Sequence, residues 1–138
     1  MSCCSSSRGF YPFIVGALII AGTWIGVAAA FPNAENEKVL RHVVLVKFKE
    51  TSSKEDQAKV LEGFRKLPSQ ISEVAGFEYG TDNSPEGLAN GFTHCFLFTF
   101  KTEKDRDAYL PHPAHQKFVD MALPHIEKVL VVDYLTNP

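Results

Sequence analysis

Cysteine is scarce in this 138-residue chain, and its placement rules out an internal crosslink in the part after residue 37. Of the three cysteines, Cys3 and Cys4 precede a long apolar run, and Cys95 is the only one that follows it. Small disulfide-stabilised domains carry an even set of spaced cysteines. The chain is therefore no disulfide scaffold, and the apolar surroundings of Cys95 favour a small buried side chain over a reactive thiol.

An excess of charge of one sign is also missing. The chain carries 14 Lys and Arg against 16 Asp and Glu, without a basic run. It has no phosphate-cradling glycine loop, no CxxC pair and no Gly-x-Ser-x-Gly elbow. We therefore expect no nucleic-acid partner and no bound cofactor.

Charge is absent altogether from residues 10–31, a run long enough to cross a bilayer, which needs roughly 20 residues. Two interpretations stay open. The run is an uncleaved apolar helix that anchors the protein in a membrane, or it belongs to a signal peptide in which Arg8 supplies the positive n-region and Ala28-Ala29-Ala30 the cleavage site. Both divide the chain into a leader with a short linker, residues 1–37, and a domain, residues 38–138. Both predict a single-pass membrane-anchored protein or an exported, periplasmic one.

After the leader, the hydrophobic pattern predicts six elements. They are a strand over 42–49, a helix capped by Ser53 that ends near Leu67 before Pro68, strands over 74–81 and 92–101, a helix that starts within 109–115, and a strand over 129–135. The weak capping box of Ser53 and Asp56 marks the first helix. The order βαββαβ is that of the ferredoxin-like α+β fold.

Both faces of the predicted sheet are apolar. In the first strand His42, Val44 and Val46 alternate with Val43 and Leu45, and the other strands alternate in the same way. Two helices can cover only one face of a sheet, so the other face needs a partner. A second copy of the chain is the simplest one, and it gives a homodimer in the form of a symmetric α+β barrel.

The segment 109–115, Tyr-Leu-Pro-His-Pro-Ala-His, is the strongest candidate for chemistry. A phenol and imidazoles that titrate near neutral pH can carry out acid–base chemistry at a carbonyl group. Pro111 and Pro113 suit the first turn of a helix, from which His112 and His115 can share one face. The alternative is structural, a helix start held by polar side chains.

The topology brings further side chains to this segment. A ferredoxin-like sheet places the first strand between the third and the fourth, so His42 and Asp133 lie at the end where the second helix begins. His94 falls at the opposite end. The phenylalanines beneath form either an apolar pocket for a small molecule or a solid core.

Three stretches resemble the stress-response A/B barrel (Dabb) family: His42-Val-Val-Leu-Val-Lys-Phe-Lys, Gly91-Phe-Thr-His94 and Tyr109-Leu-Pro-His-Pro-Ala-His115. The likeness covers the whole segment 42–138 and is greatest to a polyketide cyclase of that family. It implies a dimeric α+β barrel in which Tyr109 and His115 are the catalytic pair and Asp133 lies near that histidine.

The same resemblance implies that His42 and His94 line a pocket, and it places Leu61 and Phe64 at the positions of the cyclase's pocket aromatics. Ile126 stands where the cyclase has a tryptophan, which leaves the substrate open. Together with the strand faces, the expected ligand-binding set is His42, Val44, Val46, Leu61, Phe64, His94, Phe96 and His112.

These residues suggest an enzyme that acts on a small apolar carbonyl compound. A neutral His115 removes a proton next to the carbonyl, Tyr109 donates a hydrogen bond to the enolate oxygen, and Asp133 orients the imidazole. The competing hypothesis is a non-enzymatic, stress-related barrel that binds a ligand or serves as a scaffold. A metal site of His42, His112, His115 and Asp133 is a third option, but the Tyr and Pro residues between these ligands have no part in coordination. We therefore expect no metal.

Overall fold

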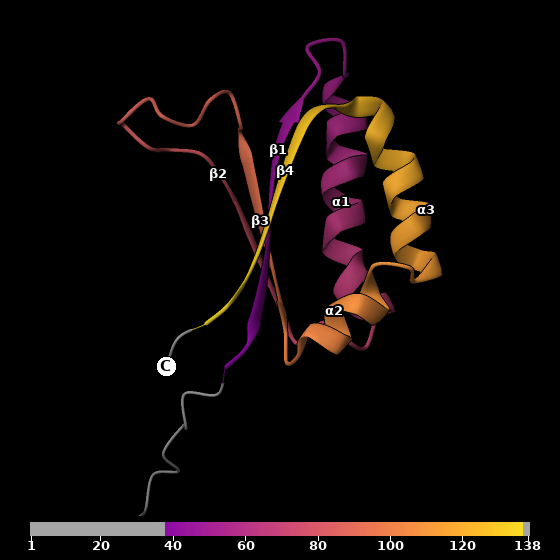
Figure 1. Ribbon diagram of the computed structural model, residues 1–138. Helices are drawn as coiled ribbons and strands as arrows, with labels where there is room; N and C mark the ends of the chain where they lie inside the picture. The colour runs from indigo at the N-terminus through magenta and orange to yellow at the C-terminus, as the bar shows by residue number, and fades with distance from the viewer. Residues whose placement is uncertain (1–37, 137–138) are drawn as a thin grey trace, which may run out of the picture. The chain divides into compact units, whose positions relative to one another are not determined.

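A single antiparallel sheet with helices on one of its faces makes up residues 38–136, the part of the chain that this computed structural model describes. The strands are β1 (Leu40–Phe48), β2 (Gly76–Thr81), β3 (His94–Phe100) and β4 (Ile126–Leu135), in the spatial order β2-β3-β1-β4. The helices are α1 (Lys54–Gln70), α2 (Glu103–Tyr109) and α3 (Pro113–Ala122), and a 3₁₀ turn, η1 (Leu123–His125), leads into β4. Figure 1 shows all three helices on the same side of the sheet. The predicted ferredoxin-like α+β fold is confirmed.

Strand register follows the predicted alternation. Along β1, every second residue from Leu40 to Phe48 is buried against the helices, and the residues between them are half-buried on the other face. The central position of β1 between β3 and β4 is confirmed, and it sets His42 opposite both Phe98 and Asp133. The chain's one buried polar side chain within residues 38–136, His42, is therefore held on the helix side of the sheet.

Aromatic side chains fill the core between the sheet and α1. Phe64 of α1 stacks on Phe96 with 3.7 Å between ring centroids, and Phe98 and Phe100 are fully buried beside them. Val60 and Leu67 complete the apolar stripe of α1. This stripe holds α1 against the sheet.

The first helix continues through Pro68, where the sequence predicts an end. Proline removes one backbone N–H, but the last turn is fixed by apolar burial on both sides of it. Leu67 and Ile71 are each 1% exposed, and the Ile71 N–H donates to the Leu67 carbonyl at 3.0 Å. Burial of these two side chains outweighs the single missing hydrogen bond.

The second helical region is two helices and not one. Thr102 and Asp105 form a full capping box that starts α2, which ends at Tyr109. His112 then caps α3 by accepting a hydrogen bond from the Ala114 N–H at 3.2 Å, and Pro113 takes the first helical position. The prediction that one helix begins within 109–115 is therefore correct for Pro113 but wrong for Tyr109, which closes the preceding helix.

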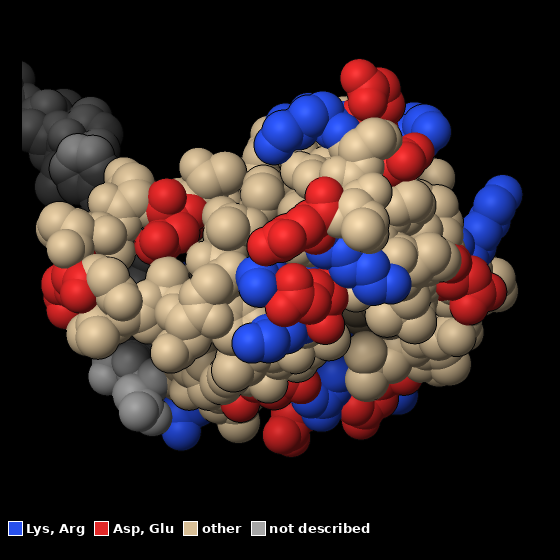
Figure 2. Space-filling view, turned by 90° about the horizontal axis from the view of Figure 1, so that it is seen from above, with Lys and Arg blue, Asp and Glu red and all other residues tan. Residues whose placement is uncertain are grey.

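The face of the sheet away from the helices is uncovered within residues 38–136. On β4, Leu130, Val132 and Tyr134 are between 40% and 48% exposed. On the surface seen in Figure 2, acidic and basic side chains are interspersed, in keeping with the near-balanced charge of the chain. Neither α1, α2 nor α3 is long and apolar enough to cross a membrane. The expected apolar helix of residues 10–31 lies outside the described residues.

Candidate functional site

A cavity of about 300 Å³ lies between the helix-facing side of β1 and β4 and the start and inner face of α3. Most of its wall is apolar, contributed by Val44, Val46, Phe64, Phe118, Val119, Ala122, Leu123, Ile126, Val129 and Val131. Its polar side chains are Tyr109, His115, His42 and Asp133. Apolar walls with a few converging polar groups are the usual character of a small-molecule site.

Tyr109 reaches the cavity from the last turn of α2. Its ring packs among Phe98, Phe100 and His115, with 4.4 Å between the Tyr109 and His115 ring centroids. Burial raises the pKa of the Tyr109 phenol well above its ordinary value of 10, so the group is a neutral hydrogen-bond donor. No residue within 38–136 forms a hydrogen bond with the Tyr109 hydroxyl. Every fully buried side-chain oxygen or nitrogen in these residues does have a hydrogen-bond partner, so the hydroxyl is not fully buried. The hydroxyl therefore opens onto the cavity.

His115 lies in the first turn of α3, where a backbone carbonyl orients its ring. Nδ1 is 2.9 Å from the Leu110 carbonyl oxygen, which can only accept, so Nδ1 carries the proton and Nε2 keeps its lone pair. Burial lowers the pKa of His115, and the hydrogen bond to the Leu110 carbonyl acts in the opposite sense; His42 and His112, whenever they are protonated, lower the pKa of His115 further. His115 is thus a neutral imidazole at pH 7, suited to accept a proton through Nε2.

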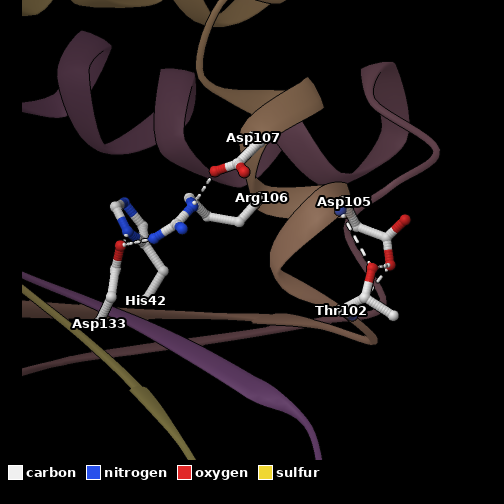
Figure 3. Close-up of polar contacts among 6 residues, drawn as sticks. All are labelled: His42, Thr102, Asp105, Arg106, Asp107 and Asp133. Atoms are coloured by element: carbon white, nitrogen blue, oxygen red, sulfur yellow. Dashed lines mark hydrogen bonds and ion pairs between the residues drawn. The ribbon is translucent and has the colours of Figure 1, made fainter.

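Asp133 pairs with His42 and not with His115. The His42 Nδ1 lies 2.6 Å from Asp133 Oδ1, and Arg106 of α2 donates to the other carboxylate oxygen (Figure 3). Arg106 also donates from Nε to Asp107 at 2.7 Å. The expectation that Asp133 orients His115 is wrong, because the β1–β4 register places Asp133 directly opposite His42.

The remaining predicted ligand-binding residues separate into two groups. Val44, Val46 and Phe64 line the cavity together with His42. Phe96 is buried in the core under Phe64, and Leu61 packs at the edge of that core.

Two of the predicted histidines lie away from the cavity wall. His94 stands at the far end of the sheet, against Phe48, and contributes to a separate recess with Leu45 and Cys95. His112 is used as the cap of α3. No group of three or more His, Cys, Asp or Glu side chains within residues 38–136 is arranged to hold a metal ion.

Several residues of the site have only weak signals in the sequence. Arg106 belongs to a helix without an apolar stripe, and the capping box of Thr102 and Asp105 is its one local marker. Val129 and Val131 share the face of Asp133, so the alternation of the last strand does identify them as a group. Nothing in the sequence marks Leu123 or Ala122 as cavity residues, because their position depends on how α3 packs.

Comparison with known families gives a match over nearly all of the described residues. A model of the stress responsive A/B barrel domain (Dabb) matches residues 40–136. A stress-response A/B barrel domain-containing protein of Arabidopsis thaliana is 37% identical over 95 residues, which are 69% of this chain and 87% of that protein. The olivetolic acid cyclase of Cannabis sativa is 26% identical over 95 residues, 69% of this chain and 94% of the cyclase.

Solved structures show the same fold. A hydroxynitrile lyase from Passiflora edulis superposes with a TM-score of 0.69 at 27% identity, over 73% of this chain and 95% of the lyase. A protein from Thermobifida fusca, described as a dimeric ferredoxin-like protein of unknown function, superposes with a TM-score of 0.61 at 24% identity, over 73% of this chain and 93% of that one.

Proposed function

The chain belongs to the stress responsive A/B barrel family, and from that premise we propose that its cavity binds a small, apolar carbonyl compound and catalyses proton removal next to the carbonyl. His115 is the base and Tyr109 the hydrogen-bond donor to the enolate oxygen. One observation carries the proposal: a neutral phenol and an imidazole with an unprotonated Nε2 line the same apolar cavity, 4.4 Å apart by ring centroids. Two relatives, an olivetolic acid cyclase and a hydroxynitrile lyase, are named as enzymes that act on small molecules.

The geometry supports this division of roles. A base that is neutral at pH 7 can accept the proton without first losing one, and the lowered pKa of His115 keeps it in that form. The raised pKa of Tyr109 keeps the phenol protonated, so that it donates to the oxygen on which negative charge develops. The two groups therefore meet the two requirements of enolisation, a proton acceptor and an oxyanion donor.

The character of the wall defines the ligand class. None of the cavity-lining side chains of residues 38–136 is Lys or Arg, so the cavity offers no cation to a carboxylate or phosphate. Burying an uncompensated anion there is costly. The preferred ligand is a neutral molecule with a carbonyl at one end and an aliphatic or aromatic body.

Proton exchange in D₂O tests the reaction without knowledge of the natural substrate. Acetophenone, with one carbonyl and an apolar ring, is incubated with the full chain, and loss of its methyl proton signal is followed by NMR. We expect exchange above the buffer rate. His115→Ala and Tyr109→Phe should each reduce the excess by a factor on the order of a hundred or more.

The matched control is His125→Ala, which removes an imidazole of η1, outside the cavity. Wild-type exchange at the buffer rate, with saturable binding of acetophenone, would favour the alternative of a non-enzymatic ligand-binding barrel. If His115→Ala lowers the melting temperature but leaves the proton-exchange rate of acetophenone unchanged, that histidine has a structural role.

We further propose that the working form is a homodimer. Its support is the apolar face formed by Val43, Leu45, Leu97, Leu130, Val132 and Tyr134, which no element of residues 38–136 covers. A structural relative is itself described as dimeric. Sheet-to-sheet packing of two copies buries this face on both chains at once.

We also propose that residues 10–31 direct the domain to or across a membrane, as an anchor or as part of a cleaved signal. The support is the sequence alone, an uncharged run of membrane-spanning length. The domain then works at a membrane surface or outside the cytoplasm.

A further inference from the structure

Three side chains from three elements form a chain of charged contacts that ends at the cavity. Arg106 of α2 donates to Asp133 of β4, and Asp133 accepts from Nδ1 of His42 on β1 at 2.6 Å (Figure 3). His42 is 5% exposed, and the side chains of Arg106 and Asp133 are 19% and 27% exposed. The His42–Asp133 contact is therefore partly buried, where charge-assisted hydrogen bonds are stronger than in water, and the Arg106–Asp133 contact lies nearer the solvent.

This arrangement decides which nitrogen of His42 faces the ligand. A carboxylate only accepts hydrogen bonds, so Nδ1 of the neutral ring carries the proton. Nε2 then keeps a lone pair. His42 lines the cavity, and no fully buried side-chain nitrogen in residues 38–136 is unpaired, so Nε2 is accessible from the cavity.

We propose that His42 is a second base of this cavity and that Arg106 is its positioning residue, acting through Asp133. The inference rests on the proposed function. In the proton-transfer step the ligand's C–H bond breaks and its electron pair stays on the ligand as an enolate. The proton forms the Nε2–H bond of His42, and its return to the ligand restores both partners without a co-reactant.

The groups around His42 favour this role. Asp133 neutralises the charge that develops on the imidazole ring, whereas the partner of His115 is a neutral carbonyl. The other titratable side chains near His42 are Tyr109, at 6.0 Å between ring centroids, and His115 behind it, and Phe98 and Phe100 complete the surroundings of the ring. Arg106 fixes the orientation of the carboxylate by holding the oxygen that His42 does not use.

The first test is spectroscopic and needs no substrate. Nitrogen-15 NMR of the full chain, solubilised in mild detergent, assigns the ring tautomer of His42. We expect the Nδ1–H form in the wild type and a mixture of tautomers in Arg106→Met. The matched control, Arg65→Met, removes a surface guanidinium on α1 and leaves the tautomer unchanged. An Nε2–H tautomer in the wild type, or an unchanged spectrum in Arg106→Met, overturns the positioning role.

The second test is proton exchange from acetophenone in D₂O. His42→Gln should lower the rate at saturating ligand by about a hundredfold. Arg106→Met should lower it by up to about a hundredfold, with little effect on the half-saturating concentration. Arg106→Lys, which keeps a charge beside Asp133, should restore part of the rate. Asp133→Asn serves as a second variant if His42→Gln fails to fold.

The outcomes separate this inference from the proposed function. Exchange that needs His115 and Tyr109 but is unaffected by His42→Gln refutes the second base and leaves the proposed function intact. If the wild type shows no exchange above the buffer rate, both proposed roles are refuted, that of His115 as the base and that of His42 as the second base. In that case the NMR experiment still decides whether Arg106 and Asp133 orient His42.

Discussion

Gly63 of α1 lies in close contact with side chains of α3, and its replacement tests how rigidly the cavity wall is packed. A Cβ at this position would lie 2.7 Å from Phe118 Cδ2 and 2.9 Å from Met121 Cε. Met121 is 37% exposed and can swing away, but Phe118 is 8% exposed and packs on Phe64 with 4.5 Å between ring centroids. The strain of Gly63→Ala therefore falls on Phe118, a residue of the cavity wall.

Two opposing effects determine the stability of this variant. Alanine is favoured over glycine inside a helix by about 1 kcal/mol. Overpacking a tight contact costs about 1–3 kcal/mol. Because the Phe118 ring is confined, we expect the second effect to prevail and the free energy of unfolding to fall by up to about 2 kcal/mol. For a domain of this size each 1 kcal/mol lowers Tm by roughly 4–8 °C.

The assay is urea unfolding at fixed protein concentration, in a cycle with Phe118→Leu, which makes room beside the new methyl group. Gly63→Ala should cost less in the Phe118→Leu background, so the two changes should couple favourably. Gly80→Ala is the control, because a Cβ there meets no atom within 4 Å. If Gly63→Ala stabilises the protein by the helix-propensity difference in both backgrounds, the close approach of α1 and α3 is not a constraint.

The other predictions concern pH, assembly and the leader. The fall of the excess exchange rate in acid should have its midpoint below pH 6.5, the ordinary pKa of histidine, because burial lowers the pKa of His115; a midpoint above 6.5 in the pH–rate profile contradicts this. Residues 38–138 expressed alone should be dimeric by light scattering, and Leu45→Asp should give monomer or aggregate because it places an unpaired charge on the apolar face; a monodisperse wild-type monomer contradicts the dimer. The full chain should fractionate with membranes or appear outside the cytoplasm, and its measured mass distinguishes an intact leader from one cleaved near Phe31. A reporter that works only outside the cytoplasm should be active when fused after residue 37; an inactive reporter together with a wholly soluble protein contradicts both export and anchoring.

The parts of the fold that could be predicted are those in which one strong periodicity acts alone. The two-residue alternation of β1 and β3 is read directly in the sequence, and burial follows it along all of β1 and along β3 from Cys95 to Phe100. The end of α1 could not be predicted from local rules, because Pro68 argues for a stop and only the tertiary burial of Leu67 and Ile71 overrides it. The helix α2 was missed for a related reason: Tyr109 is its only buried residue, so it has no apolar stripe to detect.

In the candidate site, the types of the functional residues could be predicted from the sequence, but their hydrogen-bond partners could not. The chemistry of Tyr109, His115, His42 and Asp133 is evident from their side chains, and the strand order places all four on one cavity. The hydrogen-bond partners of these side chains could not be predicted in the same way. The carbonyl that orients His115 belongs to Leu110, in the short link between α2 and α3, and a backbone group gives no sequence signal.

The pairing of His42 with Asp133 depends on strand register more than on either residue. His42 and Asp133 are opposite partners in β1 and β4, and that register runs unbroken from Leu40 to Lys47 before it shifts near Phe48. A slip of one residue would turn Asp133 to the uncovered face and bring Val132 or Tyr134 to the cavity instead. The apolar residues that must stay on each face therefore do more than stabilise the sheet. By forbidding the slip, they hold a carboxylate against a buried imidazole, and Arg106 of α2 donates to that carboxylate from the helix side of the sheet.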